Sequence, residues 1–309
     1  MDCALYHEGQ RFSCLICYHV LQFVDRSFLS TDFRCKQMFF KTVFPLTGLL
    51  DLLCPPVCPV CSGLIEDSDE PFCSTCIQKI VTPVGHFCLR CGGRRFVSPN
   101  SNTTEGCPRC RTTTFRFKRV IALGEYERDL RLLVLRMKTD RTGILAISAA
   151  QMLATARCAE WENVQADYVV PVPMHYFRRE DRGVNSPDIL AEELARQLNI
   201  PLARHIVQRI RRTDLQYTLS RQARAENVKD AFALRPPGFW QQLVAKSRGR
   251  IASQSPDLSS KNILLVDDIF TTGATCNEIT KVLLSAGARS VAVAVLARAE
   301  GMKGIANHV

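Results

Sequence analysis

The pattern of apolar and polar positions becomes regular from about residue 116 onward. Short apolar runs there predict strands at 117–126, 168–172, 261–266 and 290–297. Apolar residues spaced three and four apart predict helices at 127–138, 143–160, 186–198 and 275–286. Strands that alternate with helices are typical of a parallel sheet, so we predict an α/β domain over residues 116–309. A polar, basic segment at 236–260 interrupts the alternation and is expected to be a flexible loop.

Residues 1–37 have the period of neither a strand nor a helix. We expect residues 1–45 to be a disordered leader or a mis-called start, with Met38 as the alternative first residue. No basic segment precedes an apolar block, as it does in a signal peptide, and no run approaches about 18–20 apolar residues. These features favour a cytoplasmic protein without a transmembrane segment.

Cysteine is concentrated in the N-terminal part, where 13 of the 15 cysteines lie within residues 1–110. Eight of them form four Cys-x-x-Cys pairs, Cys58/Cys61, Cys73/Cys76, Cys88/Cys91 and Cys107/Cys110. Two thiolates separated by two residues can bind one ion from a tight turn, and a second pair completes a tetrahedral site. We therefore predict a double zinc-ribbon-like domain at 46–115 that holds one or two Zn²⁺ ions.

The spacing does not decide how these four pairs combine or whether they bind metal. In the simplest arrangement the first two pairs hold one zinc and the last two hold another, but interleaved pairing is an alternative. Disulfides are a second alternative, although disulfide scaffolds are usually small and secreted. A redox role is a third, although a thioredoxin-like pair belongs to a strand–helix context that these pairs lack.

The charge of the chain favours a phosphate-rich partner, because 40 Lys and Arg against 30 Asp and Glu give a formal net charge of +10. Basic residues are interleaved with Phe115 and Phe117 at 109–119, which suits backbone contact and base stacking on single-stranded DNA. The alternative is a solvated basic face with both phenylalanines in the core. Six arginines at 204–224 likewise suit either phosphate contact or a solvated face.

The most informative segment is an apolar strand that runs into Asp267 and Asp268 and then into Thr271-Thr272-Gly273-Ala274-Thr275. Ligands bind at the carboxyl ends of parallel strands, and backbone amides at a helix start suit a phosphate. The two carboxylates can accept hydrogen bonds from two ribose hydroxyls. Together these groups describe a site for a ribose 5-phosphate unit, and the spacing of a Walker loop is absent.

This segment resembles the loop of type I phosphoribosyltransferases that binds phosphoribosyl pyrophosphate (PRPP). The resemblance implies a parallel sheet with helices on both faces. It also implies that Asp267 and Asp268 contact the ribose hydroxyls and serve any catalysis, while residues 271–275 hold the 5-phosphate. In that family Mg²⁺ accompanies PRPP, and a loop after an earlier strand receives the pyrophosphate. The corresponding candidates here are Lys138, His175 and Arg182.

The wider chain resembles the ComF family, whose members join a zinc ribbon to a phosphoribosyltransferase-like domain and act in natural competence. The similar blocks are residues 49–63, 124–140, 169–185 and 209–232, so that the resemblance spans roughly residues 46–298. Three features depart from the family pattern, namely Val184, Ser186–Pro187 and the long connector at 236–260. None of them removes a residue of the PRPP loop.

The resemblance leaves three interpretations of function. The first is a DNA-uptake protein that binds PRPP or a related ribose phosphate and single-stranded DNA, with a competence helicase or another DNA-processing protein as partner. The second is a true phosphoribosyltransferase of nucleotide metabolism, in which a nitrogen nucleophile displaces pyrophosphate. The third is a zinc-stabilised adaptor with a vestigial pocket. No segment plainly supplies the hood with which type I enzymes recognise a nucleobase.

Overall fold

The computed structural model describes residues 55–65, 71–83, 87–94, 107, 110, 113–173, 185–211, 221–235 and 257–299. Contacts divide the chain into two compact units, residues 1–73 and 74–309. The expected leader at 1–45 and most of the expected loop at 236–260 lie outside the described residues. Among the described residues no helix is long and apolar enough to cross a membrane.

The second unit is built on a four-stranded parallel sheet in the order β1-β6-β5-β2. Its strands are β1 (Arg119–Glu125), β2 (Tyr168–Pro171), β5 (Asn262–Phe270) and β6 (Ser290–Arg298). The strands are apolar along their middles because both faces of the sheet are covered, as the buried runs in β5 and β6 show. This confirms the predicted parallel α/β sheet.

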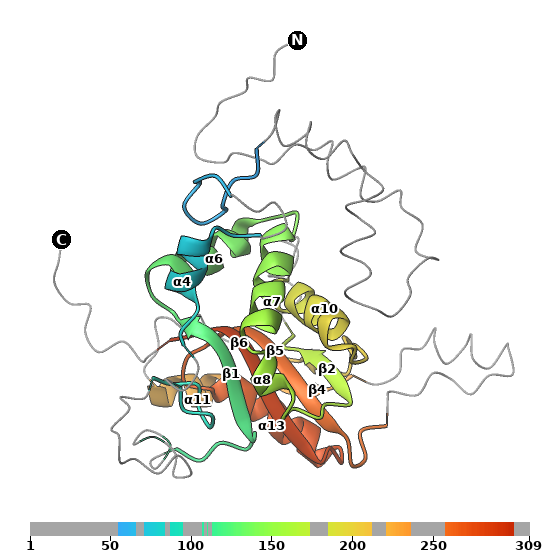
Figure 1. Ribbon diagram of the computed structural model, residues 1–309. Coiled ribbons are helices and arrows are strands. Elements are labelled where there is room, and N and C mark those ends of the chain that lie inside the picture. Colours follow the sequence, from blue (N-terminus) through green and yellow to red (C-terminus); the bar gives the residue numbers. More distant parts are fainter. Residues whose placement is uncertain are drawn as a thin grey trace, which may run out of the picture. The chain divides into compact units, whose positions relative to one another are not determined.

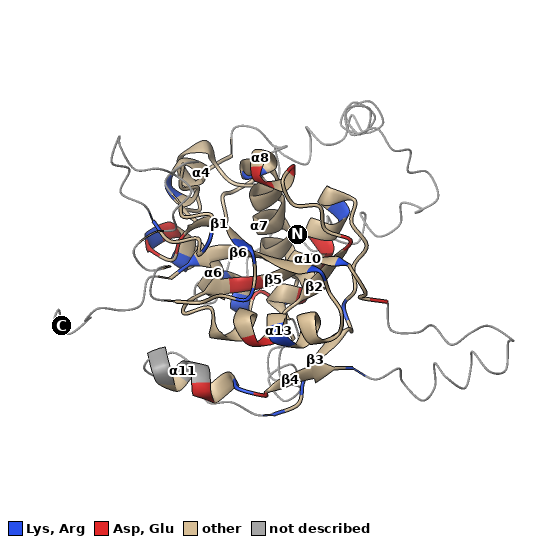
Figure 2. Ribbon diagram, turned by 90° about the horizontal axis from the view of Figure 1, so that it is seen from below, with Lys and Arg blue, Asp and Glu red and all other residues tan. Residues whose placement is uncertain are grey.

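Helices pack on both faces of this sheet (Figure 1). The helices are α4 (Ser74–Ile80), α6 (Arg128–Thr139), α7 (Ile144–Ala156), α8 (Cys158–Trp161), α10 (Ser186–Leu198), α11 (Arg221–Val228) and α13 (Ala274–Ser285). Helices α7 and α10 lie side by side over one face, and α13 lies on the other. An antiparallel pair, β3 (Val207–Arg209) and β4 (Phe232–Leu234), packs beside α13 and was not predicted. In Figure 2 the charged residues lie mainly on helices and connections, whereas the strands are largely tan.

Two elements differ from their predicted extents. The strand expected to end at 266 continues to Phe270, because β6 is long enough to pair with Asp267 through Val295 and with Phe270 through Arg298. The two acids therefore lie within the strand and not in a loop after it. The helix expected at 143–160 is interrupted at Arg157, which separates α7 from α8.

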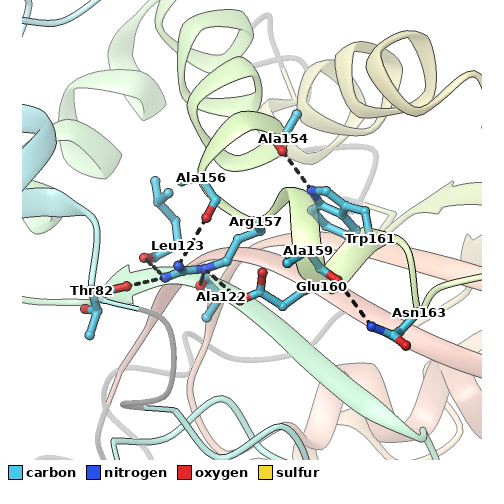
Figure 3. Close-up of polar contacts among 10 residues, drawn as sticks. All are labelled: Thr82, Ala122, Leu123, Ala154, Ala156, Arg157, Ala159, Glu160, Trp161 and Asn163. Carbon is cyan, nitrogen blue, oxygen red and sulfur yellow. Dashed lines mark hydrogen bonds and ion pairs between the residues drawn. The ribbon is translucent and has the colours of Figure 1, made fainter.

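The interruption places the Arg157 guanidinium inside the protein, where the residue is only 1% exposed (Figure 3). The guanidinium donates hydrogen bonds to the carbonyls of Ala122 (2.8 Å) and Leu123 (2.7 Å) in β1 and of Thr82 (2.7 Å) after α4. It also lies 5.0 Å from the centre of the Phe87 ring. Arg157 thus fastens the segment between the second and third Cys-x-x-Cys pairs to the edge of the sheet.

Candidate functional site

The ligand loop, residues 271–275, lies at the carboxyl end of β5 and leads into α13. β2 ends beside β5, since Pro171 pairs with Val266 and the Val172 amide donates to the Val266 carbonyl at 2.8 Å. The loop that follows β2 therefore begins next to Asp267. This is the edge of a parallel sheet at which ligands bind.

Asp267 and Asp268 are half-buried at this edge, and a cation is held against them. Lys138, in the last turn of α6, lies 3.2 Å from a carboxylate oxygen of Asp268. The Asp267 carboxylate accepts a hydrogen bond from the Asp268 amide at 2.9 Å. Burial, and then repulsion from Asp268, raises the pKa of Asp267 well above its ordinary value, while Lys138 opposes the rise. Two acids and one cation thus share a small site.

The loop is shaped around Gly273, which precedes the first residue of α13 with a φ of +81°. A side chain there would collide with the Phe270 ring and would bring a Cβ to 3.1 Å from Phe115. The Thr272 hydroxyl accepts a hydrogen bond from the Ala274 amide at 3.3 Å, and Thr271, Thr272 and Thr275 remain partly exposed. The positive end of the α13 dipole therefore meets three hydroxyl-bearing residues, an arrangement that suits a phosphate.

The structure brings together Lys138, Asp267, Asp268 and the loop at 271–275. His175 and Arg182, the remaining pyrophosphate candidates, lie outside the described residues. Among the arginines of 204–211, three have structural contacts. Arg204 pairs with Glu192 at 2.5 Å, and Arg209 stacks on Phe232. Arg211 donates to two backbone carbonyls, one in the last turn of α11 and one just after it.

The cysteines form two groups of four, in which the sulfurs lie within 4.8 Å of one another. The first tetrad is Cys58, Cys61, Cys73 and Cys76, and the second is Cys88, Cys91, Cys107 and Cys110. This is the simplest of the pairings that the spacing allows, and interleaved pairing is wrong. The described cysteines are free thiols, which excludes disulfides among them.

The geometry of both tetrads fits a zinc ion. Sulfur pairs are 3.6 Å apart in the first tetrad and 3.4–3.7 Å apart in the second, close to the roughly 3.8 Å expected around a tetrahedral ion with bonds of about 2.3 Å. The hydrogen bond between Cys88 and Cys91 lowers the pKa of the Cys88 thiol to about 4 and, together with burial, raises the pKa of the Cys91 thiol. Of these two sulfurs, Cys88 is therefore the one whose thiolate is favoured, and zinc would have to displace the proton of Cys91. The eight predicted metal ligands therefore stand where two zinc sites need them.

The two phenylalanines proposed to stack on bases are core residues. Phe115 is 5% exposed and Phe117 is fully buried. Their rings stack on one another at 4.8 Å and meet the Phe270 ring edge-on. The base-stacking role expected for them is therefore wrong, and the part of the alternative that places both phenylalanines in the core is the one observed.

Sequence reasoning missed Arg298, the last residue of β6, which is 2% exposed. Its guanidinium donates to the carbonyls of Cys91 at 2.9 Å, of Phe270 at 3.0 Å and of Thr271. A cation at the end of an otherwise apolar strand is the signal that could have found it.

Two domain families match the chain, one over the cysteine-rich segment and one over the C-terminal part of the α/β domain. Residues 49–115 match the double zinc ribbon domain, and residues 189–305 match the phosphoribosyl transferase domain. Competence protein F of Haemophilus influenzae is 30% identical over 247 residues, which cover 78% of this chain and 96% of that protein. The chain belongs to the ComF family.

Other relatives place the chain in the same ComF family. DNA utilization protein YhgH of Escherichia coli K12 is 28% identical over 80% of this chain and 99% of its own length. Competence protein ComFC of Bacillus subtilis is 25% identical over 71% of this chain and 80% of its own length. The matches to Competence protein F and YhgH thus extend over almost the whole length of those relatives.

Proposed function

We propose that this ComF protein binds PRPP, or a related ribose 5-phosphate, together with Mg²⁺, and that it also binds single-stranded DNA and acts in DNA uptake. The observation that supports this ligand is the site in which Lys138, Asp267 and Asp268 lie together, just before a Thr/Gly loop. The printed names of its relatives, competence and DNA utilization proteins, support the role in DNA uptake. A helicase or another DNA-processing protein is the proposed partner class.

Each part of the ligand has a counterpart in the site. The 5-phosphate would accept hydrogen bonds from loop amides and from the hydroxyls of Thr271, Thr272 and Thr275, at the positive end of α13. The ribose diol would donate to Asp267 and Asp268. Lys138 would then exchange its contact with Asp268 for the anionic pyrophosphate, which Mg²⁺ would also bind. The acids therefore need a cation in the free protein, and Lys138 supplies it.

Thermal unfolding of the full chain tests this site. We expect PRPP with Mg²⁺ to raise the melting temperature of the wild type, because a ligand that binds only the folded state stabilises it. Asp268→Asn should reduce the rise strongly. Asp230→Asn, at an exposed acid after α11, is the matched control and should keep the rise. A wild-type chain whose melting temperature does not change with millimolar PRPP and Mg²⁺ would contradict the proposal.

A cationic cavity at the opposite edge of the sheet supports the DNA part of the proposal. Its volume is about 360 Å³, and it lies at the amino ends of β1, β5 and β6. Lys118, Arg119 and Arg289 line it, with Glu162 as the acid among its lining residues. Three cations in one hollow suit the phosphates of a single strand, and the buried phenylalanines leave backbone contact as the proposed basis of binding.

The salt dependence of binding to an oligothymidylate tests this surface. For single strands, each neutralised phosphate contributes about 0.7 to the slope of log affinity against log salt. Replacing Lys118, Arg119 and Arg289 together by alanine should weaken binding and reduce the slope by about 2. The control replaces the exposed Lys79, Arg136 and Lys229, which changes the net charge equally. Equal losses in the two triple variants would overturn the assignment of the surface.

A further inference from the structure

A single buried side chain joins the second cysteine tetrad to the ligand loop. Arg298 donates from Nε to the carbonyl of Cys91, one of the four sulfur-bearing residues, at 2.9 Å. From Nη1 it donates to the carbonyls of Phe270 (3.0 Å), Thr271 and Ala299. One rigid guanidinium therefore fixes the distance between a metal-binding turn and the first residue of the loop at 271–275.

The aromatic cluster makes a second connection between the same two sites. The chain leaves Cys110 and passes through Phe115 and Phe117, whose rings pack on Phe270. The Phe115 ring is one of the groups that would crowd a side chain at Gly273. The Arg116 amide donates to the Asn277 side chain in α13 at 2.7 Å. Gly273 of the ligand loop and Asn277 of α13 thus lie against residues that follow the second tetrad in the chain.

The second tetrad itself belongs to the core of the sheet domain. Cys88, Cys91 and Cys107 are buried in the same hydrophobic cluster as Phe270 and Cys276. The Val120 amide of β1 donates to the Leu89 carbonyl, inside the turn between Cys88 and Cys91, at 3.0 Å. A change in this turn is therefore transmitted to packed neighbours, since a close-packed interior has little room to absorb it.

We propose that Arg298 is a positioning residue through which metal in the second tetrad sets the shape of the ligand loop and its affinity for phosphate. The inference rests on the proposed function only for the identity of the ligand. Metal held by four sulfurs fixes the turn at Cys88–Cys91 and hence its Cys91 carbonyl. The Arg298 guanidinium, held by that carbonyl, then fixes the carbonyls of Phe270 and Thr271 at the start of the loop.

Hydrogen–deuterium exchange of the full chain measures this link without any ligand. We expect the peptide that covers 271–276 to exchange at least tenfold faster in Cys110→Ser, which opens the second tetrad at its partly exposed ligand. Cys61→Ser, at the exposed ligand of the first tetrad, is the matched control and should change that peptide less than twofold. The peptide at 168–171 in β2 reports global unfolding in either variant.

Arg298→Met tests whether Arg298 connects the second tetrad to the ligand loop, independently of metal binding. The variant should retain the zinc content of the wild type, yet exchange the 271–276 peptide faster and bind PRPP with Mg²⁺ at least tenfold more weakly. Arg298→Lys should not restore either property, because one ammonium cannot replace a guanidinium that donates in two directions.

Two results would overturn the link. One is an Arg298→Met chain with normal loop exchange. The other, which applies even if that variant fails to fold, is a wild-type chain whose loop exchange stays constant when zinc is removed and then restored. A wild type that shows zinc-dependent loop exchange but no affinity for PRPP would contradict the proposed function and leave the link standing.

Discussion

The two cysteine tetrads begin with the same turn but have different surroundings. In the first, the Cys58 amide donates to the Gly63 carbonyl at 2.8 Å, and in the second the Cys88 amide donates to the Gly93 carbonyl at 2.8 Å. Cys61 of the first turn is exposed, whereas its counterpart Cys91 is fully buried. The second turn lies within the core that also contains the end of β5.

One position in the two turns shows this difference at the level of sequence. Ser62 and Gly92 occupy it, with φ values of +61° and +65°. Serine is tolerated in this left-handed conformation where its side chain meets solvent. At Gly92 a Cβ would lie 2.9 Å from Val120 of β1, so the second turn requires glycine for space as well as for conformation. The same metal-binding motif is thus a surface feature in one case and a part of the sheet core in the other.

The largest expected effect is a difference in the free energy of unfolding when one ligand is removed from each tetrad. Cys91→Ser removes a buried ligand and leaves a buried polar group, so it should lower the free energy of unfolding of the second unit by about 4 kcal/mol. Cys61→Ser should leave the denaturation of that unit nearly unchanged. Urea unfolding followed by tryptophan fluorescence, with zinc content measured on each sample, checks both. Equal destabilisation by the two variants would remove the distinction between the tetrads.

The second largest effect concerns the segment between the tetrads. Arg157→Met removes the hydrogen bonds to Thr82, Ala122 and Leu123 and leaves these buried carbonyls without a donor from residue 157. We expect a loss of about 3 kcal/mol in the free energy of unfolding, because each hydrogen bond from a charged group contributes about 1.5–3 kcal/mol, relaxation recovers part of the sum, and the Leu123 carbonyl still accepts from the Thr82 amide at 3.2 Å. Arg136→Met, at an exposed arginine of α6, is the control and should cost less than about 0.5 kcal/mol.

Exchanging serine and glycine at the equivalent positions 62 and 92 tests whether the second turn is packed more tightly than the first. Gly92→Ser should cost about 2 kcal/mol, because the left-handed conformation and the contact with Val120 both penalise a side chain. Ser62→Gly should be neutral or slightly stabilising, by up to about 1 kcal/mol. Denaturation curves of the two single variants test the pair. A Gly92→Ser chain as stable as the wild type would show that the second turn is not packed as described.

The smallest expected effect is a pH dependence of the free energy of unfolding that arises from Asp267. The pKa of Asp267 is raised on folding, so its favourable contribution is complete below its unfolded pKa of about 4 and is lost as the pH rises through the folded value. Asp267→Asn should therefore raise the free energy of unfolding by about 1 kcal/mol at pH 7 and by progressively less toward pH 4. Denaturation at several pH values measures this. A constant difference between the two chains would contradict the assignment.

Much of the fold follows from patterns in the sequence. The strands β1, β2, β5 and β6 could be predicted from apolar runs, and the helices that flank them from apolar residues spaced three and four apart. The short β3–β4 pair could not, because three-residue strands carry no period. The end of β5 was also missed, since two adjacent acids do not look like a strand and are held there by pairing with β6.

The site was accessible to sequence reasoning only in part. The acids, the Thr/Gly loop and the eight cysteine ligands follow from local spacing. The role of Phe115 and Phe117 and the contacts of Arg298 depend on partners far along the chain, as the 207 residues between Arg298 and Cys91 illustrate. A local pattern cannot show whether an aromatic residue between cations faces solvent or the core.

The most direct test of the central claim is a calorimetric titration of PRPP with Mg²⁺ into the full-length protein, with the zinc content of the same sample measured. The site of Lys138, Asp267 and Asp268 predicts one ligand per chain in samples whose second tetrad is filled. It also predicts that affinity falls at least tenfold when zinc is removed and returns when zinc is restored. A folded, zinc-loaded chain that gives no binding would contradict the ligand site, and an affinity that is independent of zinc would contradict its support by the second tetrad.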